Sequence, residues 1–387
     1  MKYVLLSPHF PRNYVRFSTG LRRAGATVLG VGDEPWEKLP DELKETLAEY
    51  YRVDDMHDYD GLVRAMGYLT HRHGKLDGID SFNEYWLQTE ARLRTDFNIE
   101  GVRNDRIMEI KRKSRMKEVY RRAGIEVAPG AVVGTLDEAR RLLGEIGYPI
   151  VAKPDIGVGA AGTRKIHGDA ELERFFAETP WADHILERFV PGRIVTFDGL
   201  ADRDGKLVFT SSLVYSDGIM ETVNEDRDVF YYTVRDIPQD LLDVGQQTAR
   251  AFGVKGRFFH FEFFRAEPDG RIVALEVNMR PPGGLTTDMF NYANDFDIYA
   301  EWANVVVRNR FEASWSRPYC CLYASRKKNR RYARSHERLL AELGHLLVHD
   351  EAIDGVFRQA LGDHGYLFRS PELDEVLEAA RLVHEIA

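Results

Sequence analysis

Two neighbouring segments of this chain, residues 258–264 and 271–280, constrain its fold more than any other part of the sequence. Both are rich in β-branched and aromatic residues, which favour strands. Between them, residues 267–270 read Glu-Pro-Asp-Gly, and the glycine suits the positive φ that a tight turn requires. The two segments therefore predict an antiparallel hairpin.

The polar residues of this hairpin fall on aligned faces. Because side chains alternate along a strand, His260 and Glu262 share one face of the first strand, and Glu276, Asn278 and Arg280 share one face of the second. With a short loop between the strands, Glu262 faces Glu276 across the pair. Like charges directly opposite each other are destabilising. The opposed carboxylates therefore predict a bound cation.

The donor atoms indicate which cation would bind. Glu262, Glu276 and Asn278 all offer oxygen atoms, which suit Mg²⁺ or Mn²⁺ better than zinc. Arg280 would lie beside the metal, where its guanidinium would bind a phosphate or a carboxylate.

An alternative is that the two carboxylates are simply exposed on the solvent face of the hairpin, which is the favoured interpretation for a single glutamate on such a strand. The alignment of several polar groups lowers the weight of that alternative. Gly283 and Gly284 follow the arginine and would let backbone N–H groups approach an anion, as in a substrate-binding site.

Composition excludes several classes of protein. The 387 residues are 44% hydrophobic and 30% charged, as in ordinary globular proteins, and predict two or three domains. The net charge of −9 argues against general nucleic-acid binding and against attraction to anionic membranes. The only cysteines, Cys320 and Cys321, are adjacent and form no disulfide framework or zinc motif, and we recognise no signal peptide or transmembrane run. We therefore expect a cytoplasmic protein.

The secondary-structure signals divide the chain into three regions. Residues 1–105 alternate strand and helix signals, which predicts an open parallel α/β sheet. Residues 106–310 follow, and residues 311–387 form an accessory α+β region.

Within the middle region, three long features stand out. The patterns predict one basic helix over residues 105–123, mainly antiparallel strands from about 194 to 280, and one helix over about 285–309.

A glycine-rich loop with Lys153 at its root follows a predicted strand. Gly157, Gly159 and Gly162 spell G-x-G-x-x-G, but the loop runs into the strand-like residues 163–166, so it is neither a dinucleotide fingerprint nor a P-loop. A glycine loop between two strands instead fits a nucleoside triphosphate, with N–H groups for the phosphates and Lys153 as a point charge. The alternative is a surface hairpin with a solvated lysine.

Over roughly residues 80–310, these motifs together resemble the ATP-grasp superfamily of carboxylate–amine and carboxylate–thiol ligases. Residues 112–129 are similar to the helix that carries the family's first phosphate-binding lysine, here Lys113, and Lys153 matches the second. Residues 185–192 resemble the hinge whose backbone reads the adenine edge. The resemblance therefore implies ATP-binding roles for Glu187, Arg188, Phe189 and Val190 in addition to the glycine loop.

The resemblance also implies roles for the hairpin and a domain plan. It assigns Glu262, Glu276 and Asn278 as metal ligands and Arg280 as the catalytic, phosphate-facing arginine. The implied fold is an N-terminal α/β sheet domain, an ATP-grasp domain of two α+β subdomains that grip ATP, and a small C-terminal region, with boundaries at residues 1–105, 106–310 and 311–387 and a glycine lid at 155–163.

The activity that the resemblance implies is ATP-dependent ligation of a small-molecule carboxylate to an amine. An acyl phosphate forms with release of ADP, and the amine then displaces phosphate, with Mg²⁺ or Mn²⁺ as the metal. Members of the family are often homodimers. Two alternatives remain open: a biotin-carboxylase-like enzyme that phosphorylates bicarbonate, and an ATP-binding regulatory protein without turnover.

Three other features of the sequence are candidates for a functional role. Glu84 stands at a strand end, where open α/β sheets bind ligands, so it is a candidate for orienting a substrate amine, although a carboxylate that stabilises a helix N-terminus is the favoured interpretation. The basic residues 326–331 suggest a solvated hairpin tip. Histidines such as His336 and His364 show no spacing typical of metal ligands.

Overall fold

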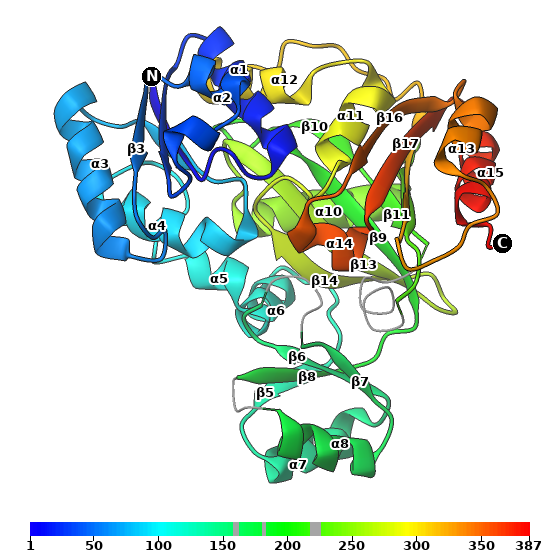
Figure 1. Cartoon of the computed structure of the whole chain (residues 1–387). Helices are drawn as coiled ribbons and strands as arrows, with labels where there is room; N and C mark the ends of the chain where they lie inside the picture. The colour runs from blue at the N-terminus through cyan, green and yellow to red at the C-terminus, as the bar shows by residue number, and fades with distance from the viewer. Residues whose placement is uncertain (158–161, 180–182, 217–225) are drawn as a thin grey trace.

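The computed structural model describes residues 1–157, 162–179, 183–216 and 226–387. The strands of these ranges form three sheets. Figure 1 shows the N-terminal sheet beside the largest sheet. A third sheet, formed by residues 130–188 and which we call the smallest sheet, projects at one end of the molecule. Among the helices of the described ranges, none has the length and apolar character needed to cross a membrane.

The N-terminal sheet is parallel throughout, as predicted, because a helix connects each strand to the next and lets successive strands run in the same direction. Its order is β3-β2-β1-β4. The strands are β1 Lys2–Leu6, β2 Thr27–Gly32, β3 Glu49–Arg52 and β4 Gly78–Asp80, and the helices are α1 Val15–Arg23, α2 Asp41–Thr46, α3 Tyr59–His73 and α4 Leu87–Asp96.

The smallest sheet is antiparallel, with the order β5-β8-β6-β7. Two helices pack their apolar faces against it, and Thr135 and Glu138 close the first turn of one of them with a reciprocal capping box. The strands are β5 Gly130–Val133, β6 Ile150–Pro154, β7 Arg164–Ile166 and β8 His184–Arg188, and the helices are α7 Leu136–Ile146 and α8 Asp169–Glu178.

The largest sheet has nine strands in the order β14-β13-β9-β11-β12-β15-β17-β16, with β10 paired to β9 outside that path. Its first six strands in chain order are β9 Gly192–Ala201, β10 Leu207–Ser211, β11 Leu213–Tyr215, β12 Phe230–Thr233, β13 Arg257–Ala266 and β14 Ile272–Asn278. The remaining three are β15 Cys320–Arg326, β16 Leu347–Ala352 and β17 His364–Ser370. Strands on both sides of residue 310 thus belong to one sheet, while the three-domain division itself stays a prediction.

The helices of the C-terminal half are α10 Gln239–Phe252, α11 Thr286–Asn294, α12 Ile298–Arg308, α13 His336–Leu343, α14 Arg358–Leu361 and α15 Leu373–His384. Helix α12 packs against α1 through an aromatic cluster in which Phe17 contacts Tyr299 and Trp302 edge-on. This contact joins the N-terminal sheet to the rest of the chain.

The single helix predicted over residues 105–123 is wrong. The chain forms α5 Ile107–Lys111 and α6 Lys113–Arg122, and Arg112 between them is extended at φ −97° and ψ 119°. The cause is Asp155, whose backbone oxygen accepts from Lys113 N at 2.9 Å and whose carboxylate accepts from Ser114 N at 2.7 Å. A carboxylate from elsewhere in the chain therefore satisfies the first N–H groups of α6.

One further prediction of secondary structure is wrong. The helix predicted over 285–309 is interrupted at Asp295, which adopts a left-handed φ of 55°, and Asp297 then caps α12 by accepting from Tyr299 N and Ala300 N. The stretch from about 194 to 280 is mainly antiparallel strands, as predicted, and it also contains α10, which packs beneath β9 and β14.

Because α10 packs closely on β9, we expect alanine substitution to have opposite effects on stability at two helical glycines. A Cβ atom added to Gly245 in α10 would lie 2.3 Å from the ring of buried Phe197, whereas one added to Gly67 in α3 meets no atom within 4 Å. We expect Gly245→Ala to lower the free energy of unfolding by about 1–3 kcal/mol through overpacking. Gly67→Ala should raise it by up to about 1 kcal/mol through helix propensity. Urea denaturation of both variants checks this pair, and equal effects would contradict the packing.

Candidate active site

The β13–β14 hairpin has the register that alternation predicted. Glu262 pairs with Glu276 and His260 with Asn278, and a bulge follows Glu262. Phe259, Phe261 and Phe263 point to the opposite face and are fully buried in the core under the sheet. The hairpin therefore presents Glu262, Glu276 and Asn278 on one face, above a layer of packed aromatic rings.

Each of the two opposed carboxylates has a cationic neighbour. Lys113 Nζ lies 3.1 Å from Glu276 Oε1, and His260 Nε2 lies 3.2 Å from Glu262 Oε1. Burial and the nearby carboxylates raise the pKa of Glu276 in spite of Lys113. At Glu262, burial also raises the pKa, but the hydrogen bond and charge of His260 outweigh it and lower the pKa overall. The hairpin therefore brings two carboxylates together on one face, which fits a site for a divalent cation.

His260 itself is held in its charged form. Its Nδ1 lies 2.5 Å from Asp198 Oδ1, and both groups are buried. Burial lowers the imidazole pKa, but the carboxylates of Asp198 and Glu262 outweigh burial and raise it to about 9. Asn278, also buried, donates from Nδ2 to Glu262 Oε1 at 3.5 Å, so the oxygen donors named from the sequence lie together.

Two buried lysines share one glutamate opposite the hairpin. Lys153 Nζ lies 2.6 Å from Glu187 Oε2, and Lys117 Nζ lies 2.5 Å from Glu187 Oε1. Burial raises the pKa of Glu187, but the two ammonium groups outweigh it and lower the pKa to about 2. Sequence reasoning named Lys153 and Glu187 but missed Lys117, although its position four residues after Lys113 places both lysines on one face of α6.

A cavity lies between the smallest sheet and the β13–β14 hairpin. Its polar lining includes Lys113, Lys117 and Lys153 together with Glu187, Glu262 and Glu276. Its remaining wall is largely apolar and includes Val151, Ile194, Phe264 and Leu275. The cavity therefore combines an apolar slot with a cluster of cations and carboxylates.

The segment predicted as a hinge borders this cavity through Glu187, Arg188, Phe189 and Val190. The backbone N–H groups of Arg188 and Phe189 donate to Pro129 O and Pro149 O at 2.8 and 3.0 Å. These two donors are therefore already engaged within the protein.

The glycine loop lies partly outside the described residues. Gly159 is outside them, while Gly157 and Gly162 are described and both approach Pro154. Gly162 adopts a φ of 74°, a conformation that glycine takes readily. A role of the loop in phosphate binding stays a prediction.

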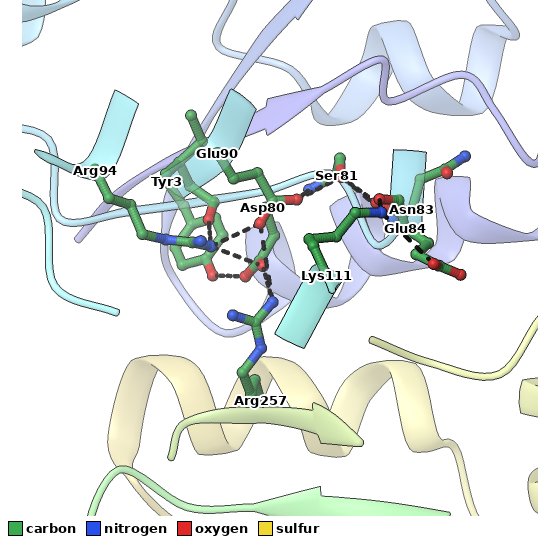
Figure 2. Close-up of polar contacts among 10 residues, drawn as sticks. Tyr3, Asp80, Ser81, Asn83, Glu84, Glu90, Arg94, Lys111 and Arg257 are labelled. Atoms are coloured by element: carbon green, nitrogen blue, oxygen red, sulfur yellow. Dashed lines mark hydrogen bonds and ion pairs between the residues drawn. The ribbon is translucent and has the colours of Figure 1, made fainter. Parts of the chain in front are cut away.

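Glu84 and Arg280 form a buried pair at the second end of the site. Arg280 Nη2 lies 3.0 Å from Glu84 Oε2 and 3.4 Å from Asn278 Oδ1. Lys111 Nζ donates to the Glu84 carbonyl oxygen at 3.0 Å (Figure 2). The side chain of Asn83, not that of Glu84, caps the turn by accepting from Tyr85 N. Glu84 thus lies in the first turn of a helix, as the favoured interpretation requires, and its carboxylate is in addition paired with Arg280.

Figure 2 shows that Glu84 and Lys111 adjoin a longer network of polar groups. Arg257 is the first residue of β13, and its Nη2 lies 3.5 Å from Oδ1 of Asp80 at the end of β4. Asp80 also pairs with Arg94. The network ties the N-terminal sheet to the strand that carries Glu262. Its further members are Tyr3, Ser81 and Glu90.

The glycine pair after Arg280 is held by the N-terminal region. Asn13 Nδ2 donates to Gly284 O at 3.1 Å, and Thr286 Oγ1 donates to Gly283 O at 2.8 Å. Gly284 has a φ of 64° and closely approaches Leu361, so a side chain is excluded there. The predicted anion-binding role of this pair is untested by these contacts.

The solvated hairpin tip predicted for residues 326–331 is wrong for its first two members. Arg326 and Lys327 are buried, and Lys327 Nζ pairs with Asp226 Oδ1 at 2.6 Å. His336 and His364, whose spacing in the sequence is not typical of metal ligands, lie close together around Asp350.

Comparison with known proteins finds similarity over part of the chain. Residues 146–288 match the family model described as the ATP-grasp domain. The chain is 24% identical over 277 residues to the carbamoyl phosphate synthase large chain of Mycobacterium sp. (strain JLS), covering 67% of this chain and 24% of that protein. It is also 24% identical over 266 residues to the L-arginine-specific L-amino acid ligase of Bacillus subtilis, covering 66% of this chain and 64% of the ligase. The chain thus spans less than two thirds of the length of both relatives.

Solved structures share the fold over nearly the whole chain. The L-amino acid ligase from Bacillus licheniformis has a TM-score of 0.76 at 15% identity and covers 100% of this chain and 97% of that one. The N5-carboxyaminoimidazole synthetase from Staphylococcus aureus complexed with ADP has a TM-score of 0.74 at 13% identity, with coverage of 97% and 95%. At these identities the likeness establishes the fold alone.

The shared glutamate of the cavity generates a prediction for stability. Because the pKa of Glu187 falls from 4.5 to about 2 on folding, its carboxylate stabilises the protein fully above pH 4.5, and that contribution is lost as the pH falls toward 2. We expect Glu187→Gln to lower the free energy of unfolding by about 3 kcal/mol at neutral pH, with the gap to wild type narrowing in acid. Urea denaturation across this range measures the gap.

Glu173→Gln is the matched control, because Glu173 pairs with Arg140 at 2.5 Å on the exposed surface. Its effect should stay within about 0.5 kcal/mol. If the difference in free energy of unfolding between Glu187→Gln and wild type did not change with pH, the ion pairs of Glu187 with the two lysines would not be what stabilises the protein. An equal loss of stability in Glu173→Gln would lead to the same conclusion.

Proposed function

We propose that this chain, which carries an ATP-grasp domain, is an ATP-dependent ligase that joins a small-molecule carboxylate to an amine and releases ADP and phosphate. The observation that carries the proposal is the cavity in which buried lysines, the hinge segment and the paired carboxylates of the β13–β14 hairpin converge. The family relationship and the ADP-bound neighbour support nucleotide binding in this place.

ATP would lie between the smallest sheet and the hairpin. The adenine fits the apolar wall beside residues 187–190, with the Val190 N–H as the hinge donor because those of Arg188 and Phe189 are engaged. Lys113 and Lys153 would bind the inner phosphates, and Lys117 would share that task. Gly157, Gly159 and Gly162 would bring backbone N–H groups to the outer phosphates.

Glu262, Glu276 and Asn278 are the proposed ligands of Mg²⁺ or Mn²⁺. Their donor atoms are all oxygens, and Glu262 and Glu276 are opposed across the hairpin. An ion held by these residues would neutralise charge on the phosphates.

Arg280 and Glu84 are the proposed groups at the acceptor end. The Arg280 guanidinium would face the phosphoryl group in transfer and so stabilise the charge that develops there. Glu84, which Arg280 and Lys111 hold in its ionised form, would orient the amine. Gly283 and Gly284 would leave backbone room for the carboxylate substrate.

The proposed reaction has two steps. A carboxylate oxygen of the acid attacks the γ-phosphorus, the bond from this phosphorus to the β–γ bridging oxygen breaks, and ADP leaves. The amine nitrogen then attacks the acyl carbon, the carbon–oxygen bond to phosphate breaks, and the nitrogen loses a proton. Positioning and charge neutralisation supply most of the rate enhancement in such a transfer.

The nucleotide product tests this proposal. In this proposal the three lysines bind the inner phosphates and Arg280 faces the terminal phosphate, so the positive charge favours transfer of the γ-phosphoryl group. We therefore expect ADP and phosphate from a mixture of ATP, candidate acids and amines. Hydroxylamine should trap the acyl phosphate as a hydroxamate. Product analysis by mass spectrometry is the measurement, and AMP with pyrophosphate as the main product would overturn the mechanism.

The same assay separates the alternatives. A reaction that depends on bicarbonate alone would favour the biotin-carboxylase-like enzyme, and tight ATP binding without any turnover would favour a regulatory protein. A homodimer and a cytoplasmic location stay predictions.

Lys153 offers the sharpest test of the phosphate site. We expect Lys153→Met to lower kcat/KM by about 100-fold or more, because it removes a buried cation from the phosphates. The fold should persist, since Lys117 still pairs with Glu187. Lys38→Ala, at a side chain that is 71% exposed, is the control and should keep wild-type activity. A folded Lys153→Met enzyme with wild-type turnover would refute the assignment.

A further inference from the structure

A second cluster of ligand-type side chains lies outside the cavity, on the C-terminal part of the largest sheet. His336, Asp350 and His364 each place one ligand atom within 4.8 Å of the others. None of the three lines the cavity that we assign to ATP. His336 is the first residue of α13, Asp350 lies in β16, and His364 is the first residue of β17.

The sheet register explains why these residues meet. Asp350 pairs with Tyr366 across β16 and β17, and His364 lies two positions before Tyr366, so both groups project from the same face. Helix α13 covers this face, because its Leu339 packs in one cluster with Tyr366. The start of α13 therefore brings His336 over the two strands.

The separations suit coordination of one ion. His364 Nε2 lies 2.8 Å from Asp350 Oδ2, and His336 Nε2 lies 3.9 Å from the same oxygen. Ligand atoms at about 2.0–2.1 Å from a tetrahedral zinc ion lie about 3.3 Å apart, a value between these two distances. Small side-chain rotations would therefore bring all three groups to zinc.

A neighbouring hydroxyl orients one of the imidazoles. His336 Nδ1 lies 3.0 Å from Tyr366 OH, which leaves Nε2 directed at Asp350. A ring nitrogen held by a second group in this way is typical of metal-ligating histidines.

We propose that His336, Asp350 and His364 form a binding site for Zn²⁺ or a similar borderline divalent cation. Two imidazole nitrogens and one carboxylate oxygen are a typical zinc donor set, whereas Mg²⁺ prefers oxygen ligands alone. The three side chains are between 26% and 40% exposed, which gives the ion access and leaves a fourth position for water. The ion joins α13 to the β16–β17 hairpin.

Zinc titration of the full chain by isothermal calorimetry, in excess Mg²⁺, tests the proposal. Excess Mg²⁺ competes with zinc for the oxygen ligands that we propose on the β13–β14 hairpin, and the histidine variants below assign the remaining zinc binding to His336 and His364. We expect one zinc equivalent per chain, a higher melting temperature with zinc, and the absorption of tetrahedral Co²⁺ when cobalt replaces it. The double variant His336→Gln/His364→Gln should lose this equivalent and the rise in melting temperature.

Two further variants sharpen the result. His349→Gln is the control, because His349 is adjacent to Asp350 on β16 but points to the other face and pairs with Glu351; it should bind zinc like wild type. Tyr366→Phe should weaken zinc binding roughly tenfold, as expected for a group that orients a ligand.

If the double variant does not fold, His364→Gln alone takes its place, since glutamine keeps a hydrogen-bonding group opposite Asp350. Zinc binding of unchanged stoichiometry and affinity in a folded variant would overturn the proposal. So would the absence of a zinc equivalent in the wild-type chain. Neither result bears on the ligase activity, which uses other residues.

Discussion

A buried carboxylate or ammonium group is tolerated only with an opposite charge in reach, and this constraint shapes the whole cavity. Glu187 is shared by Lys117 and Lys153, Glu276 is paired with Lys113, and Arg280 is paired with Glu84. Each cation that we direct at ATP already has a carboxylate partner in the protein. Nucleotide binding would therefore be an exchange of partners, in which phosphate oxygens compete with these carboxylates for the same ammonium groups. Before nucleotide binds, the carboxylates neutralise the buried cations and so keep the protein stable, while the cavity stays open.

Alternation and turn chemistry were enough to predict the hairpin. A period of two residues fixes which side chains share a face. The turn at residues 267–270 pairs Arg265 with Ile272, and a bulge after Glu262, which the sequence did not predict, completes the opposition of Glu262 and Glu276. The parallel N-terminal sheet was predictable for a similar reason, because strand and helix signals alternate there. These features depend on residues that lie close together in the chain.

Features that depend on distant residues could not be predicted. The break at Arg112 is produced by Asp155, which follows it by 43 residues. The cluster of His336, Asp350 and His364 exists only because α13 folds over β16 and β17, and its spacing in the chain matches no familiar zinc motif. Lys117 is different, since its helical spacing from Lys113 was visible in the sequence and was overlooked.

The continuation of the largest sheet past residue 310 has a consequence for the integrity of the chain. Strand β15 hydrogen-bonds to β12 on one side and to β17 on the other, so the final segment supplies the partner for a strand in the middle of the protein. A protease cut or a stop codon near residue 310 would leave β12 as an open, aromatic edge with unpaired N–H and C=O groups. Such edges recruit strands from other molecules. Loss of the C-terminal segment would therefore favour aggregation rather than a smaller working enzyme.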